Sequence, residues 1–186
     1  KLPNKKFFKP LILFSISMGV LVYVFMNLSL FHSSIIAPII LGSQLAIPFG
    51  ILASAFLLNE NVSKNKWILI FTSFIGIFII FFDPKLTENY LGLFFASLMA
   101  LFFGLAQVYS RQLKELPISM INASTGIFGF VILIIISVFI EGSVQENIEQ
   151  IDFESWMLIS YQAVIVSLCA HPVSYTHLTL PTTGVV

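Results

Sequence analysis

The chain has 186 residues, of which 58% are hydrophobic and only 10% are charged. A soluble domain carries roughly 25% charged residues, so this composition excludes an ordinary water-soluble fold. The formal net charge is zero and Cys169 is the single cysteine, which argues against nucleic acid as a partner and excludes both an internal disulfide and a cysteine-based zinc cluster.

Long apolar runs without charged residues predict six membrane-spanning helices, because a helix needs about 20 apolar residues to cross a bilayer. Barrel strands are the alternative, but the runs lack alternation and exceed the roughly 10-residue length of such strands. In chain order the predicted helices cover 10–30, 34–58, 67–82, 90–109 and 118–140, and a sixth begins near Ser155. We therefore predict an all-α, polytopic transmembrane helix bundle in the lipid bilayer.

The basic residues predict the orientation of this bundle. Eight of the nine Lys and Arg residues lie before the first helix, between the second and third, or between the fourth and fifth. The positive-inside rule makes these segments cytoplasmic and the remaining loops, which hold only Lys85, external. We expect a multi-pass protein of the inner membrane. The eight are Lys1, Lys5, Lys6, Lys9, Lys64, Lys66, Arg111 and Lys114.

Small residues recur every four positions in the fourth predicted helix, at Gly92, Ala96, Ala100 and Gly104. This spacing predicts a face on which neighbouring helices pack closely, and Gly126 and Gly129 in the fifth helix are candidates for the same role. We expect a large residue at Ala100 to disturb packing more than one at Gly92, which lies near the helix end. These residues indicate helix packing rather than a ligand site.

The second predicted helix contains the strongest candidate for a site. Pro48 has no N–H group, so we expect the Gln44 carbonyl to lose its helical partner at the depth where the Gln44 side chain also lies. Polar groups near the bilayer midplane need protein, water or ligand as partners. Two interpretations remain open: a structural kink, or a polar spot in a central cavity of the kind that transporters build from interrupted helices.

Further uncharged polar residues lie within the predicted helices, and each of them is a candidate for the same cavity or for hydrogen bonding between helices. Because no intramembrane carboxylate accompanies them, they suit a neutral or zwitterionic small solute better than a proton relay. Neither a catalytic constellation, a metal motif nor a cofactor motif is recognisable, so we expect a protein that is not an enzyme. The candidates besides Gln44 are Asn27, Gln107, Asn122, Tyr161 and Gln162.

The stretch GSQLAIPFGILASAFLLNENVSKNKW, followed by ILIFTSFIGIFII, resembles the EamA repeat of the drug/metabolite transporter superfamily. The resemblance rests on Gln44, Pro48, Phe49, Glu60 and Gly76, while Asn59 replaces the usual glycine before Glu60. The segment YLGLFFASLMALFFGLAQVYSRQ looks like the start of a second repeat. The resemblance implies ten helices in two inverted repeats and the export of small metabolites such as amino acids by alternating access.

On this basis we interpret the chain as a fragment that holds six of the ten helices. Residues 1–82 correspond to the last three helices of the first repeat, and residues 90–172 to the first three of the second. Residues 173–186 read VSYTHLTLPTTGVV, which looks like a translated sequencing adapter. Substrate, coupling ion and oligomeric state are not predicted. A membrane-embedded enzyme or a non-transporting membrane subunit is the main alternative, and a channel is a weaker one because no charged ring or filter sequence occurs.

Overall fold

The structure is a computed structural model that describes residues 5–81, 89–141, 149 and 151–165. In these ranges every regular element is a helix, as the sequence predicts. The predictions for Lys85, for most of the external loop that follows the fifth predicted helix and for the tail 173–186 concern residues outside the described ranges. The elements are α1 (Lys5–Ile16), η1 (Ser17–Leu21), α2 (Val22–Phe31), α3 (Ala37–Ser43), α4 (Ala46–Leu58), α5 (Lys64–Phe81), α6 (Tyr90–Gln112), α7 (Ile118–Glu141) and α9 (Phe153–Tyr161).

Four helical stretches are long and apolar enough to cross a membrane. The remaining two predicted helices are present, but their described parts are shorter than these four stretches: α5 has 18 residues and α9 has 9. The second predicted helix differs most, because it divides into α3 and α4 instead of running unbroken. The four stretches are Lys5–Phe31, Ile39–Leu58, Tyr90–Gln112 and Ile118–Ile140.

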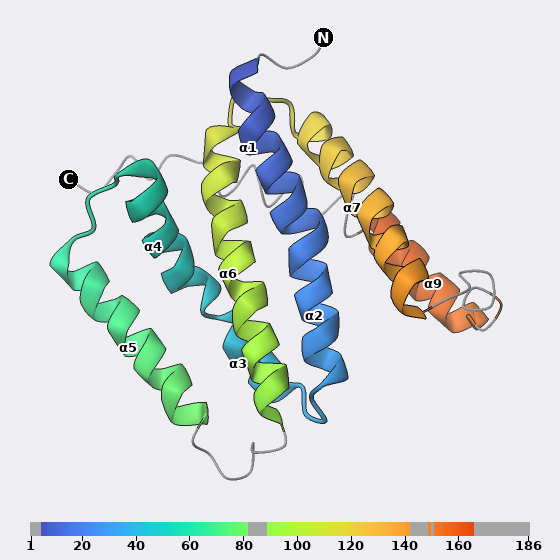
Figure 1. The fold of residues 1–186 in the computed structure, drawn as a ribbon, viewed down its shortest axis with the longest axis horizontal. Helices are drawn as coiled ribbons and strands as arrows, with labels where there is room; N and C mark the ends of the chain where they lie inside the picture. Colours follow the sequence, from blue (N-terminus) through green and yellow to red (C-terminus); the bar gives the residue numbers. More distant parts are fainter. Residues whose placement is uncertain (1–4, 82–88, 142–148, 150, 166–186) are drawn as a thin grey trace.

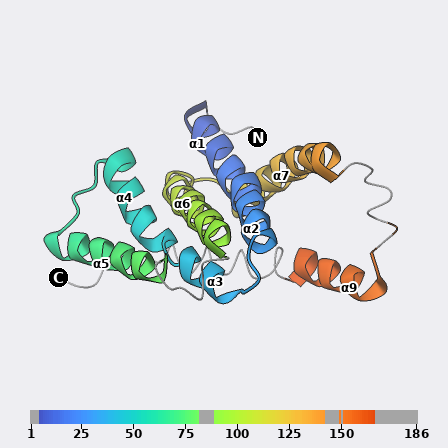
Figure 2. The ribbon, with the colours of Figure 1, turned by 60° about the horizontal axis from the view of Figure 1, so that its bottom comes forward.

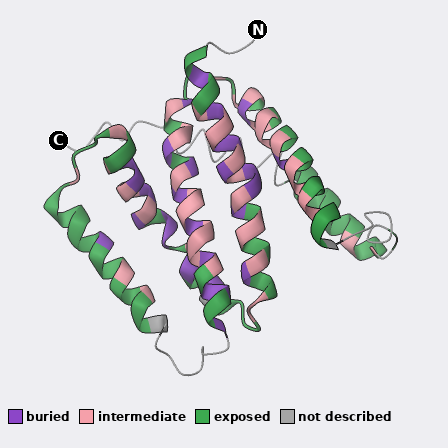
Figure 3. Ribbon diagram, viewed as in Figure 1, coloured by how far each residue is buried: buried purple, intermediate pink, exposed green. Residues whose placement is uncertain are grey.

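The helices alternate in direction around α6 (Figure 1). The first stretch, α5 and α7 run one way, and α3–α4 and α6 run the other way. Helix α6 packs on α1, α2, α3 and α4, with α4 and α5 on one side of it and α7 on the other (Figure 2). Buried residues gather on α1–α2, α3–α4 and α6, whereas α5 and much of α7 are exposed (Figure 3). Exposed Ile and Phe side chains on these outer helices suit contact with lipid.

The small face of α6 is a packing face, as predicted. Ala96 and Ala100 are fully buried, and a Cβ placed on Gly42 of α3 would lie 2.9 Å from the Cβ of Ala96. The expectation that a large side chain disturbs packing less at Gly92 than at Ala100 is wrong, because a Cβ on Gly92 would lie 2.6 Å from the Cβ of Ser33. The end of α6 is packed because the link between α2 and α3 folds against it.

The two glycines of α7 differ from each other. A Cβ on Gly129 would lie 2.9 Å from the Gly19 carbonyl oxygen, so the backbones of η1 and α7 touch at this point. Nothing lies within 4 Å of a Cβ on Gly126, so its prediction as a packing residue is wrong for the described part of the chain. The reason is that α7 meets its neighbours, α1 and η1, along one face only.

Candidate functional site

The interruption between α3 and α4 positions Gln44, the strongest candidate from the sequence. The chain tightens ahead of Pro48: the Gln44 N–H donates to the Leu41 carbonyl at 3.1 Å, and the Leu45 N–H donates to the Gly42 carbonyl at 3.1 Å. Pro48 is therefore the third residue of α4, where a missing N–H costs no helical hydrogen bond. The sequence places the proline inside one long helix, and the structure places it at the start of a second helix.

The expectation that the Gln44 carbonyl lacks a partner is wrong. This oxygen accepts a hydrogen bond from the Ile47 N–H at 3.3 Å, because the turn between the helices brings that donor within reach. The Gln44 side chain is exposed, and none of the hydrogen bonds of the described residues involves its amide. The polar feature at the interruption is thus the side chain of Gln44 rather than its backbone.

The interruption lies level with the middle of α6. Leu45 and Ala46 form one buried cluster with Ala100, the eleventh residue of the 23-residue α6. If α6 spans the bilayer, Gln44 therefore lies near the midplane.

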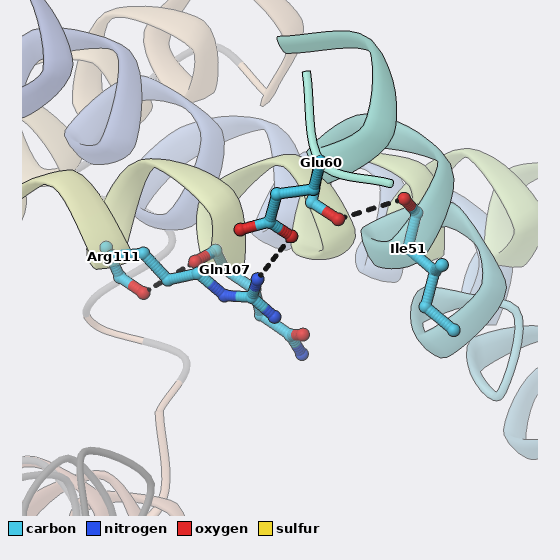
Figure 4. A network of polar contacts seen from close by, with 6 residues as sticks. Ile51, Glu60, Gln107 and Arg111 are labelled. Carbon is cyan, nitrogen blue, oxygen red and sulfur yellow. Dashed lines mark hydrogen bonds and ion pairs between the residues drawn. The ribbon is translucent and has the colours of Figure 1, made fainter. Parts of the chain in front are cut away.

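Gln107 is the second candidate on this side of the bundle. Its Oε1 atom lies 3.4 Å from the position that a Cβ on Gly50 would take, so the amide rests against the backbone of α4. One turn further along α6, Arg111 forms an ion pair with Glu60, Nη1 to Oε2, at 3.3 Å (Figure 4). Gln107 therefore lies on the α4 side of α6, between the packed middle of the two helices and their charged end.

The remaining candidates are not brought together with Gln44 and Gln107. Asn27 is exposed on α2 and donates to the Tyr23 carbonyl of its own helix at 2.9 Å. Asn122 is half-buried on α7. Tyr161 and Gln162 are exposed at the end of α9, which lies on the far side of the bundle from α4 and α5 (Figure 2). The described residues thus place Gln107 at the α4–α6 contact, and they do not assemble the six predicted residues into one cavity.

A group of hydroxyls at the crossing of the first stretch and α7 was missed by the sequence reasoning. The Ser15 and Ser124 hydroxyls are hydrogen-bonded at 2.9 Å, and Ser15 is fully buried. Next to them the first stretch turns through the π-helical segment η1, in which Ser17 is also buried. Segments of this kind are frequent at functional sites. The detectable signal was the occurrence of serines within an otherwise apolar run.

An open apolar hollow of about 430 Å³ separates α5 from the α3–α4 turn and α6. Ser97 contributes the one hydroxyl among its lining residues, and that hydroxyl donates to the Leu93 carbonyl of its own helix. The hollow therefore offers no free polar group to a solute. Among the described residues, no three His, Cys, Asp or Glu side chains converge to hold a metal ion.

Comparison with known proteins gives no match to a family model, a curated protein or a solved structure.

Proposed function

We propose that this chain belongs to a secondary transporter of the EamA type that exports a small neutral or zwitterionic metabolite, such as an amino acid, across the inner membrane. The observation that carries the proposal is the exposed carboxamide of Gln44 at the interruption between α3 and α4. The second supporting observation is Gln107 on the α4 side of α6.

The physical argument concerns the depth of Gln44. A carboxamide that faces hydrocarbon loses its hydrogen bonds to water, which is costly. An exposed Gln44 level with the middle of α6 is therefore best accounted for by a water-filled cavity or pathway on this side of the bundle. Interrupted helices near the midplane are a common way for transporters to present polar groups to a solute. Because the residues that face this region carry no charge until Arg111 and Glu60, a solute without net charge suits it best.

The test uses the intact protein in inside-out membrane vesicles and a panel of radiolabelled amino acids. We expect Gln44→Leu to reduce uptake at least tenfold while expression, insertion and thermal stability in detergent stay near those of the wild type, because the side chain forms no hydrogen bond with the described residues.

The matched control is Thr72→Val on α5, which also removes an exposed intramembrane polar group. The Thr72 hydroxyl donates to the Ile68 carbonyl of its own helix, so this change should leave uptake unaltered. Wild-type uptake by Gln44→Leu at equal expression would contradict the proposed site.

A further inference from the structure

The two charged contacts at one end of the bundle differ in what lies beneath them. Lys6 Nζ and Glu115 Oε2 are 2.9 Å apart, at the start of α1 and the link between α6 and α7. This pair lies at the same end as a buried apolar cluster in which Phe7 and Leu11 of α1 pack against Leu113. Apolar burial therefore holds α1, α6 and α7 together at this end, and the ion pair adds little to that contact.

The contact between Glu60 and Arg111 has no such support. The middle of α4 packs backbone to backbone on α6, since a Cβ on Gly104 would lie 2.7 Å from the Gly50 nitrogen. Beyond this point α4 becomes exposed, with Phe56 at 76% and Leu57 at 47% exposure. Asn59 then ends the helix in the left-handed conformation, and Glu60 follows it directly.

At the opposite end, α6 is held by buried and part-buried hydrogen bonds rather than by charges. The Oδ1 atom of Asn89, a residue only 2% exposed, accepts from the Ser34 N–H at 2.8 Å and from the Ser33 hydroxyl at 3.0 Å. The buried Ser29 hydroxyl donates to the Gly92 carbonyl at 2.7 Å. Hydrogen bonds shielded from water resist opening more than ion pairs between half-exposed side chains. The charged end of the α4–α6 contact is thus weaker than the contact of α6 with α2 and the α2–α3 link at its other end.

We propose that Glu60 and Arg111 form a latch that closes the charged end of the α4–α6 contact, and that its release lets the end of α4 move away from α6 while α1, α6 and α7 stay together. The inference rests on the proposed function, because it makes the latch the cytoplasmic gate of the solute pathway. The exposed residue Gln107 lies one turn before Arg111 on the same helix (Figure 4).

The experiment measures distances by pulsed electron paramagnetic resonance in the intact protein, reconstituted in nanodiscs with Cys169→Ser. One spin-label pair, at Asn61 and Ser119, reports on α4 relative to α7, and a second, at Phe8 and Ser119, reports within the α1–α7 unit. We expect Arg111→Gln to increase the population of longer 61–119 distances by a factor of about 1.4 to 5, the range that an exposed ion pair supplies. The 8–119 distances should not change.

Three variants separate the latch from a general effect of charge. Glu60→Gln removes the same ion pair from its other side and should reproduce the shift, which protects the test if Arg111→Gln folds poorly. The exchange Glu60→Arg with Arg111→Glu should restore the wild-type distances. Lys6→Gln, which breaks the other ion pair, should leave both distance distributions unchanged because the apolar cluster holds that contact.

Unchanged 61–119 distances in both Arg111→Gln and Glu60→Gln would overturn the latch, as would an equal shift in Lys6→Gln. The distance measurement does not use transport, so a failed uptake assay would count against the proposed function and a failed distance measurement against the latch.

Discussion

Gly50 and Gly104 bring α4 and α6 into backbone contact: a Cβ on Gly104 would lie 2.7 Å from the Gly50 nitrogen and 3.0 Å from the Ala46 carbonyl oxygen. Neither atom can move without shifting the start of α4, so Gly104→Ala should lower the free energy of unfolding by about 1–3 kcal/mol, as overpacking usually does. Thermal unfolding of the intact protein in detergent measures this. Gly76→Ala on α5 is the control. Nothing lies within 4 Å of a Cβ there, so stability should stay unchanged or rise by up to about 1 kcal/mol through helix propensity. Equal effects of the two changes would show that α4 and α6 do not meet at these glycines.

Ala100 and Gly92 should respond alike to a large side chain, although the position of Gly92 near the helix end predicted a smaller effect there. Ala100 is fully buried against Leu45 and Ala46, and Gly92 is enclosed by Ser33 and Ser29. Ala100→Leu and Gly92→Leu should each destabilise the protein by roughly 1–3 kcal/mol, measured as loss of thermal stability in detergent. Ala123→Leu on the exposed face of α7 should have almost no effect. A stable Gly92→Leu variant would mean that the α2–α3 link does not pack on α6.

Asn59 is the one described non-glycine residue with positive φ, at 51°, and it ends α4. Gly and Asn are the residues that tolerate the left-handed conformation best. Asn59→Gly should therefore be neutral, whereas Asn59→Val should lower the free energy of unfolding by about 1–2 kcal/mol. Asn61→Val, two residues further along, should cost much less. Tolerance of valine at position 59 would show that α4 does not end in this way.

Asp152 caps α9 and makes the start of that helix sensitive to acid. Its side chain accepts a hydrogen bond from the Ser155 N–H at 2.9 Å, and hydrogen bonds from the side chain and then the backbone of Ser155 lower the pKa of Asp152 below 3.8. Because the pKa is lower in the folded helix, the ionised carboxylate stabilises that helix at any pH above the pKa of the unfolded chain. This stabilisation is lost as the pH falls through the pKa of the folded state.

Hydrogen exchange of the Ser155 amide measures the effect. Protection relative to an unstructured peptide should be present at about pH 6 and decline once the pH has fallen below the ordinary carboxyl value of 3.8. Asp152→Asn keeps a capping oxygen without a titrating group, so its protection should not depend on pH over this interval. The same decline in Asp152→Asn would assign the effect to another group.

The positions of the helices could be predicted from the sequence, because bilayer thickness and the need to pair backbone groups make the length of an apolar run decisive. The predicted helices at 90–109 and 118–140 begin at the same residues as α6 and α7, Tyr90 and Ile118. The small residues of α6 also indicated its packing face correctly, since only small side chains let backbones touch.

The partners of each residue were decided by the tertiary structure. Pro48 was visible in the sequence. Only the turn at Gln44 and Leu45 shows that α4 starts anew just before this proline, so that its missing N–H removes no helical hydrogen bond. The polar candidates look alike in sequence, yet Gln107 lies against Gly50 while Tyr161 lies on a helix across the bundle. The length and hydrophobicity of an apolar run determine whether that segment can span a membrane, which is a local property of the sequence. Which faces meet, and hence which polar groups share a site or an ion pair, depends on contacts between residues such as Glu60 and Arg111 that are far apart in the chain.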